Sequence, residues 1–145
     1  FELGAGGVAP SIIYALRKMK VSKITLSNRT KQKAESLKNL FKDLEIVEWG
    51  VTPNFDMVIN ATSIGLKNKD GIKLDYDKIG TNKFFYDVIY NPKKTNFLLE
   101  GEKRGHQIEN GKMMFIYQAV LAFEMWTGLI PPATNKKVLQ LLEND

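Results

Sequence analysis

The chain has 145 residues, of which 43% are hydrophobic and 26% charged, a composition typical of a globular protein with one domain. It contains no cysteine, and its longest apolar stretch, residues 113–126, is shorter than the roughly 20 residues that span a bilayer, so we expect no disulfides and no membrane partner. The net charge is +5, but the lysines are scattered along the chain, and we therefore expect no nucleic-acid partner. The sequence shows no signal peptide, and we expect a cytoplasmic location.

The first part of the chain alternates between strand and helix patterns. Residues 1–3 have the character of a strand end, and apolar positions recur at helical spacing over residues 8–19, with Pro10 in the first turn where its missing N–H is harmless. Residues 23–27 alternate like a second strand. A second helix then begins with Thr30 as its expected N-cap.

Strand and helix patterns continue to the end of the chain. We expect three more strands, then a helix capped by Thr95, a short strand, an apolar helix stopped by Gly128, and a final helix. The expected ranges are 46–49, 56–60 and 83–88 for the strands, 95–105 for the helix, 107–109 for the short strand, 111–126 for the apolar helix and 134–142 for the last helix.

Strands that alternate with helices through short links predict an α/β fold, a Rossmann-like doubly wound parallel sheet with helices on both faces and further helices at the C-terminus. We expect six strands in the order 3-2-1-4-5-6, with ligands at the carboxyl ends of the strands near the central crossover. The expected core positions are Ile24, Leu26, Val58, Ile59, Phe85, Ile116 and Phe123.

A glycine-rich turn joins the first strand to the first helix. The segment Gly4, Ala5, Gly6, Gly7, Val8, Ala9 satisfies G-x-G-x-x-A, a pattern typical of dinucleotide-binding proteins. Its first glycine allows a tight turn, its second lets the backbone approach a pyrophosphate, and its final alanine lets the helix pack closely on the sheet. The helix N-terminus then offers N–H donors to phosphates. Glycines between a strand and a helix can also be turn chemistry alone.

The end of the second strand indicates which dinucleotide would bind. An NAD enzyme carries an acidic residue there for the ribose 2′-hydroxyl, whereas this chain has Asn28, Arg29 and Thr30, with Lys33 one helical turn further on. Two cations suit a 2′-phosphate, so the sequence favours NADP. The alternative interpretation is a solvated N-cap without a ligand.

Residue types alone leave several polar positions open. Residues 60–66 are compatible with a plain Ser/Thr turn, and residues 87–92 with a strand end stopped by proline. Gln118 lies in an otherwise apolar helix, where it either binds a buried backbone group or points into a site. His106 is expected on the solvated surface. No cluster has metal-ligand spacing, so we expect no metal.

Taken together, several segments resemble the shikimate dehydrogenase family, specifically its C-terminal NADP-binding domain. The segments that carry the resemblance, in order along the chain, are GAGGVA, NRT, NATSIGL, DVIYNP with Thr95 and Leu98 following, NGKMMFIYQAVLAFEMWTG and the closing proline. The resemblance implies an NADP-dependent oxidoreductase that reduces 3-dehydroshikimate to shikimate in the chorismate pathway of aromatic amino-acid biosynthesis.

The resemblance also implies roles for particular residues. Residues 4–9 would hold the pyrophosphate, and Asn28, Arg29, Thr30 and Lys33 would bind the 2′-phosphate and adenine, although the family often has Arg where this chain has Lys33. The residues implied near the nicotinamide are Val88, Gly111, Thr62 and Ser63. Those implied to contact the substrate, shikimate or 3-dehydroshikimate, are Tyr90 and Gln118.

The family's catalytic lysine and aspartate belong to an N-terminal domain to which nothing in this chain corresponds. We therefore expect no catalytic residue within residues 1–145, which would form one NADP-binding domain of a two-domain enzyme, inactive by itself and either a monomer or a homodimer. One alternative is a quinate/shikimate dehydrogenase that uses NAD, although that cofactor prefers an acidic residue near Asn28. The other alternative is a non-catalytic NADP-binding regulatory module.

Overall fold

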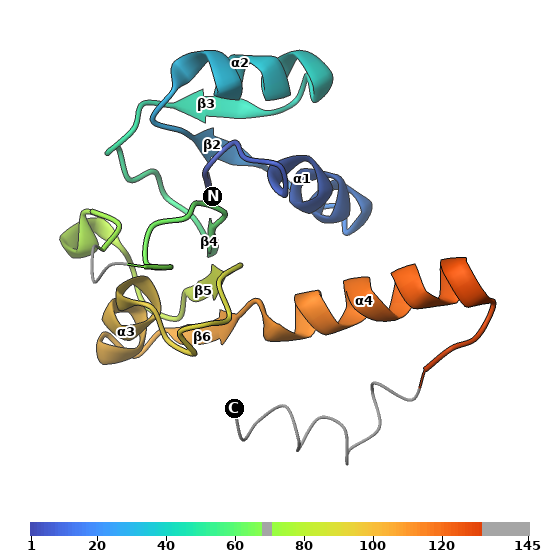
Figure 1. The fold of residues 1–145 in the computed structure, drawn as a ribbon. Helices are drawn as coiled ribbons and strands as arrows, with labels where there is room; N and C mark the ends of the chain where they lie inside the picture. The colour runs from blue at the N-terminus through green and yellow to red at the C-terminus, as the bar shows by residue number, and fades with distance from the viewer. Residues whose placement is uncertain (68–70, 132–145) are drawn as a thin grey trace. The chain divides into compact units, whose positions relative to one another are not determined.

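The computed structural model describes residues 1–67 and 71–131, and the chain divides into two units, residues 1–110 and residues 111–145. Within the first unit, strands and helices alternate along the chain except that β3 is followed directly by β4 (Figure 1). Its elements are β1 (Glu2–Leu3), α1 (Ala9–Lys18), β2 (Thr25–Ser27), α2 (Lys31–Leu40), β3 (Glu45–Val47), β4 (Met57–Asn60), the 3-10 helix η1 (Tyr76–Lys78), β5 (Phe84–Asp87), α3 (Asn96–Lys103) and β6 (Gln107–Asn110). The described part of the second unit contains α4 (Lys112–Thr127).

The six strands form one parallel sheet in the order β3-β2-β1-β4-β5-β6, which confirms the predicted fold class and strand order. The shortest strand, β1, lies in the middle, where Glu2 is in register with Leu26 on one side and Ile59 on the other. From β1 the chain first adds β2 and β3 on one side of the sheet and then β4, β5 and β6 on the other, so the direction in which strands are added reverses at β1. Ligands of such sheets bind above this point, at the carboxyl ends of the strands.

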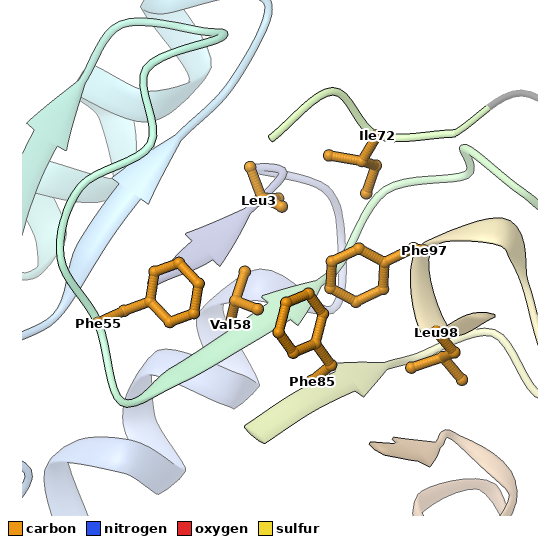
Figure 2. Close-up of a cluster of buried hydrophobic side chains, with 7 residues drawn as sticks. All are labelled: Leu3, Phe55, Val58, Ile72, Phe85, Phe97 and Leu98. Carbon is orange, nitrogen blue, oxygen red and sulfur yellow. The ribbon is translucent and has the colours of Figure 1, made fainter. Parts of the chain in front are cut away.

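The two faces of the sheet are covered by different helices. On one face, Leu3, Val58 and Phe85 pack with Phe97 and Leu98 of α3, in the cluster drawn in Figure 2. On the other face, α1 and α2 supply Ile12, Ile13 and Ala34, which pack against strand residues such as Leu26 and Ile59. In the inner strands β4 and β5, successive residues thus point alternately to the two faces of the sheet, as expected for a sheet covered on both sides.

The ring of Phe85 is the centre of the first cluster. Its centroid lies 5.1 Å from that of Phe97 and 6.1 Å from that of Phe55, and the imidazole of His106 stacks on it at 5.1 Å and 9°. The expectation that His106 lies on the solvated surface is therefore wrong, because the residue is only 9% exposed and its Nδ1 accepts the N–H of Lys83 at 3.4 Å. Burial, aided by nearby positive charges, lowers the pKa of His106 below its usual value.

Most of the expected core positions are buried. The residues in this group are Ile24, Leu26, Val58, Ile59, Phe85 and Ile116. Phe123 is an exception, with 40% of its surface exposed, so the prediction for this residue is wrong. The sequence of α4 is apolar on nearly every side, and such a helix has no periodicity that would tell a buried position from an exposed one.

The helix ends agree with the sequence pattern in most places. Thr95 caps α3 with its hydroxyl, and Gly128 ends α4 with a left-handed φ of 71°, as predicted. Thr30 occupies the N-cap position of α2 but makes no side-chain capping bond. The helix expected over 134–142 lies outside the described residues. None of the described helices has the length and apolar character that a membrane span requires.

Candidate functional site

A pocket of about 460 Å³ lies at the carboxyl ends of β1, β2, β3 and β4, around the central crossover of the sheet. The segments that follow these strands supply its walls. The residues that line it are Gly4, Ala5, Gly6, Asn28, Arg29, Thr30, Lys33, Trp49, Ala61, Thr62, Ser63 and Ile64. The structure thus brings together nine of the residues that the sequence predicted at a cofactor site.

The glycine turn after β1 packs tightly against the loop after β4. Gly4 has a φ of +108°, and a Cβ atom at this position would lie 2.8 Å from the carbonyl oxygen of Ala61. On the other side, the N–H of Gly4 donates to the carbonyl of Ser27 at 2.8 Å. Gly6 is less crowded, since its Cβ would lie 3.8 Å from Ala61 O. Gly4 is therefore required by the fold itself, whereas Gly6 keeps the floor of the pocket open.

The other residues of the glycine motif do not line the pocket. Ala9, the first residue of α1, is fully buried, and Val8 packs against the cluster around Ile59. Gly7 is exposed, with no atom within 4 Å of where its Cβ would lie. The first turn of α1 contains no acidic residue, so the positive end of the helix dipole lies beside the glycine turn. The N–H groups of Ala9 and Ser11 already donate to Gly6 O at 3.2 Å and Val8 O at 3.1 Å, and Pro10 has no N–H.

The segment after β2 brings two cations to the pocket. Asn28 connects this segment to the glycine turn, because its Oδ1 accepts the N–H of Ala5 at 2.9 Å and its Nδ2 donates to Thr30 O at 2.8 Å. Arg29 and Lys33 both line the pocket, and no lining residue is a carboxylate. The electrostatic environment of this wall therefore favours an anion.

Trp49 is a lining residue that sequence reasoning missed. It follows β3 and is 37% exposed, and the preceding backbone is held by a hydrogen bond of 3.1 Å from the Ser27 hydroxyl to Glu48 O. Aromatic rings at such a position can stack on a nucleobase. The sequence does contain a signal for Trp49, because an aromatic residue that follows a predicted parallel strand lies at the edge of the sheet where ligands bind.

Asn60, the last residue of β4, holds the loop that forms the opposite wall. Its Oδ1 accepts the N–H of Thr62 at 3.0 Å and the Thr62 hydroxyl at 2.7 Å, and the same hydroxyl accepts the N–H of Ile64 at 3.0 Å. Thr62 and Ser63 both line the pocket. This segment is more than a plain Ser/Thr turn, because a buried asparagine fixes its path.

The remaining predicted site residues lie elsewhere. Val88 packs against the cluster around Ile59, and Tyr90 is 43% exposed in the segment after β5; neither lines the pocket. Gly111 and Gln118 belong to the second unit, where Gly111 occupies the N-cap of α4 and Gln118 is exposed.

Comparison with known proteins shows which proteins this chain is similar to. A family model for the shikimate 5′-dehydrogenase C-terminal domain matches residues 114–135. The NADP(+)-dependent shikimate dehydrogenase of Pelagibacter ubique is 56% identical over 136 residues, which cover 94% of this chain and 51% of that protein. The chain is similar to the C-terminal domain of shikimate dehydrogenases. It spans about half the length of the curated relatives it matches.

Solved structures in and around the shikimate dehydrogenase family have the same fold. The shikimate 5-dehydrogenase of Thermus thermophilus, in complex with NADP(H) and shikimate, matches with a TM-score of 0.75 and 32% identity over 90% of this chain and 49% of its own. A ligand-free 5-ketofructose reductase from Gluconobacter matches with a TM-score of 0.82 and 31% identity, over 97% of this chain and 55% of its own. The fold of this chain therefore occurs in reductases with different substrates.

Proposed function

We propose that the pocket binds NADP(H) and that the whole protein reduces 3-dehydroshikimate to shikimate. The observation that carries the cofactor assignment is that Arg29 and Lys33 line the same pocket as the glycine turn, with no carboxylate among the lining residues. A dinucleotide with an extra 2′-phosphate matches two cations, whereas NAD is usually held by an acidic residue at this position.

The residues of the pocket divide among the parts of the cofactor. The pyrophosphate lies against Gly4–Gly6 and the N-terminus of α1, since that is where the uncrowded backbone of Gly6 and the positive end of the helix dipole coincide. The 2′-phosphate is held by Arg29 and Lys33, and the adenine lies against Trp49. The family resemblance supports the rest: Thr62, Ser63, Val88 and Gly111 on the nicotinamide side, and Tyr90 and Gln118 toward the substrate.

The activity of the whole protein is supported by the names of its relatives and by the fit of the cofactor site. Hydride transfer to a carbonyl needs a proton donor and a substrate held in position, and we assign both tasks to the part of the enzyme outside residues 1–145. Residues 1–145 alone should therefore bind NADPH without turning over shikimate. The cytoplasmic location and the monomeric or homodimeric state stay predictions.

Calorimetry with NADPH and NADH tests the cofactor assignment. Lys31 and Lys33 form a matched pair, because both are exposed lysines in the first turn of α2 and only Lys33 lines the pocket. Lys33→Ala and Arg29→Ala should each weaken NADPH binding about tenfold or more, the scale of a charge-assisted hydrogen bond, and leave NADH binding nearly unchanged. Lys31→Ala should have little effect on either cofactor.

Two results would contradict the assignment. Equal losses for both cofactors would mean that these cations hold the fold or stack on adenine, without reading the 2′-phosphate. Tighter binding of NADH than NADPH by the unmodified chain would favour the alternative of an NAD-dependent quinate/shikimate dehydrogenase. The oxidation of shikimate, followed at the absorbance of NADPH, separates an enzyme from a regulatory module, because only the enzyme gains turnover when the whole protein replaces residues 1–145.

A further inference from the structure

Asp87, the last residue of β5, is a fully buried carboxylate outside the pocket. It accepts hydrogen bonds from three different segments: from Nδ2 of Asn60 at 3.0 Å, from the N–H of Ile89 at 3.0 Å and from the hydroxyl of Thr95 at 2.5 Å. Burial raises the pKa of Asp87 and these bonds oppose the rise. Burying a carboxylate is unfavourable unless its oxygens accept hydrogen bonds, so the three donors are needed to keep Asp87 in this position.

On one side, Asp87 acts on the cofactor wall through Asn60. The amide of Asn60 has only one orientation that fits, because its Nδ2 faces the Asp87 carboxylate and the carbonyl of Ile64 at 3.2 Å. Its Oδ1 is thereby aimed at the N–H and the hydroxyl of Thr62. Asp87 thus fixes the orientation of the side chain that holds the Thr62 loop.

On the other side, Asp87 is connected to α3 and to the segment that carries Tyr90. The hydroxyl of Thr95 donates to Asp87 and accepts the N–H of Leu98 at 3.4 Å, so the N-cap of α3 is part of the network. The 61–66 loop also packs directly on it, since a Cβ at Gly65 would lie 3.1 Å from Thr95 Cβ. The N–H of Ile89, immediately before Tyr90, is held by Asp87 itself.

We propose that Asp87 is a positioning residue that couples the loop forming one wall of the cofactor pocket to the segment bearing Tyr90. This inference rests on the proposed function, which assigns the Thr62 loop to the cofactor and the Tyr90 segment to the substrate. The carboxylate touches neither ligand. It acts through Asn60 on one side and through the Ile89 backbone on the other. A shift of the Thr62 loop therefore changes the position of the Tyr90 segment, and the reverse also holds.

Thr95 gives the sharpest test, because it contacts Asp87 but does not line the pocket. Thr95→Val removes the hydroxyl at nearly constant shape, Thr95→Ser keeps it, and Asp87→Asn is a second variant that removes the charge. Thr127→Val is a control, since its hydroxyl also accepts a backbone N–H near a helix end, from Leu129 at 3.2 Å. Circular dichroism would select the temperature at which every variant is folded.

Amide hydrogen exchange is the first readout. Thr95→Val should expose the Leu98 amide in any case, because its cap is lost. If the network couples the segments, the amides of Thr62, Ile64 and Ile89 should also exchange about tenfold faster, with protection kept in Thr95→Ser and in Thr127→Val. Unchanged protection of Thr62 and Ile64 in both Thr95→Val and Asp87→Asn would overturn the proposal.

NADPH affinity is the second readout, and a merely structural role would not move it. We expect Thr95→Val and Asp87→Asn to raise the Kd for NADPH several-fold while Thr95→Ser stays close to the unmodified chain. Lower melting temperatures with an unchanged Kd would refute the coupling to the pocket. Failure of the unmodified chain to bind NADPH would instead overturn the proposed function, and the exchange measurement would still decide whether the two segments are coupled.

Discussion

Replacement of Glu2 by an apolar residue should stabilise the fold, because Glu2 is a carboxylate in the middle of the sheet without a hydrogen-bond partner. It is fully buried on β1, flanked in register by Leu26 and Ile59, and neither of its carboxylate oxygens has a partner. Burial raises the pKa of Glu2 from 4.5 to about 8. The folded chain therefore holds this proton more tightly than the unfolded chain, and stability falls as the pH rises from 4.5 toward 8.

The size of the effect follows from the two pKa values. Each unit of difference corresponds to about 1.4 kcal/mol, so the cost of Glu2 rises from about 1 kcal/mol at pH 5 to about 4 kcal/mol at pH 8. The Phe1 amine works in the opposite sense, because burial lowers its pKa from 8.0 to about 6 and its protonated form destabilises the fold as the pH falls. Acetylation of Phe1 removes this second contribution together with the positive charge that lowers the pKa of Glu2, so it can only increase the effect of Glu2.

Urea unfolding of the acetylated chain between pH 5 and pH 8 is the assay. Glu2→Leu should be more stable than the unmodified chain at every pH, and the difference should grow by about 3 kcal/mol across this range. Glu2→Gln, which keeps the shape but cannot ionise, should lose the same pH dependence. A difference between Glu2→Leu and the unmodified chain that stays constant with pH would refute the reasoning.

Three further predictions concern packing and protonation. Gly101→Ala should lower the free energy of unfolding by about 1–3 kcal/mol, because its Cβ would lie 2.8 Å from the Phe85 ring, whereas Gly80→Ala, with its nearest contact at 3.5 Å, should have a much smaller effect in the same urea titration. Gly4→Ala should abolish NADPH binding in calorimetry because of its φ of +108° and its contact with Ala61, and Gly7→Ala, which meets nothing within 4 Å, should keep the fold. Since the pKa of His106 is lowered in the folded chain, protonation should destabilise the fold below pH 6.5, so His106→Phe should lose less stability than the unmodified chain between pH 7 and pH 5; equal losses would contradict this.

The sheet and the glycine turn could be predicted because their signals are local. Strand and helix patterns in alternation imply parallel pairing and right-handed crossovers, and these rules leave few strand orders. The turn at Gly4 and the cap at Thr95 are likewise written in a few adjacent residues. The two cations after β2 were found because their spacing from the glycine turn is set by one strand and one helix.

Features that depend on pairs of distant residues escaped the sequence analysis. Asn60 and Asp87 are 27 residues apart, and only the register of β4 and β5 makes them neighbours. His106 was expected in solvent because nothing near it in the chain announces the Phe85 ring on which it stacks. The prediction that Phe123 is buried failed for a different reason, since a helix that is apolar on nearly every side has no pattern that separates buried from exposed positions.

The place of Trp49 in the pocket wall gives the chain a built-in optical reporter. The chain has two tryptophans, and the other, Trp126, is 82% exposed on α4 in the second unit. Trp126→Phe would leave one indole, located where the cofactor is proposed to bind. Indole emission overlaps the absorption of a reduced nicotinamide and not that of an oxidised one. Such a chain would report, without any added dye, both the occupancy of its pocket and the oxidation state of the bound cofactor.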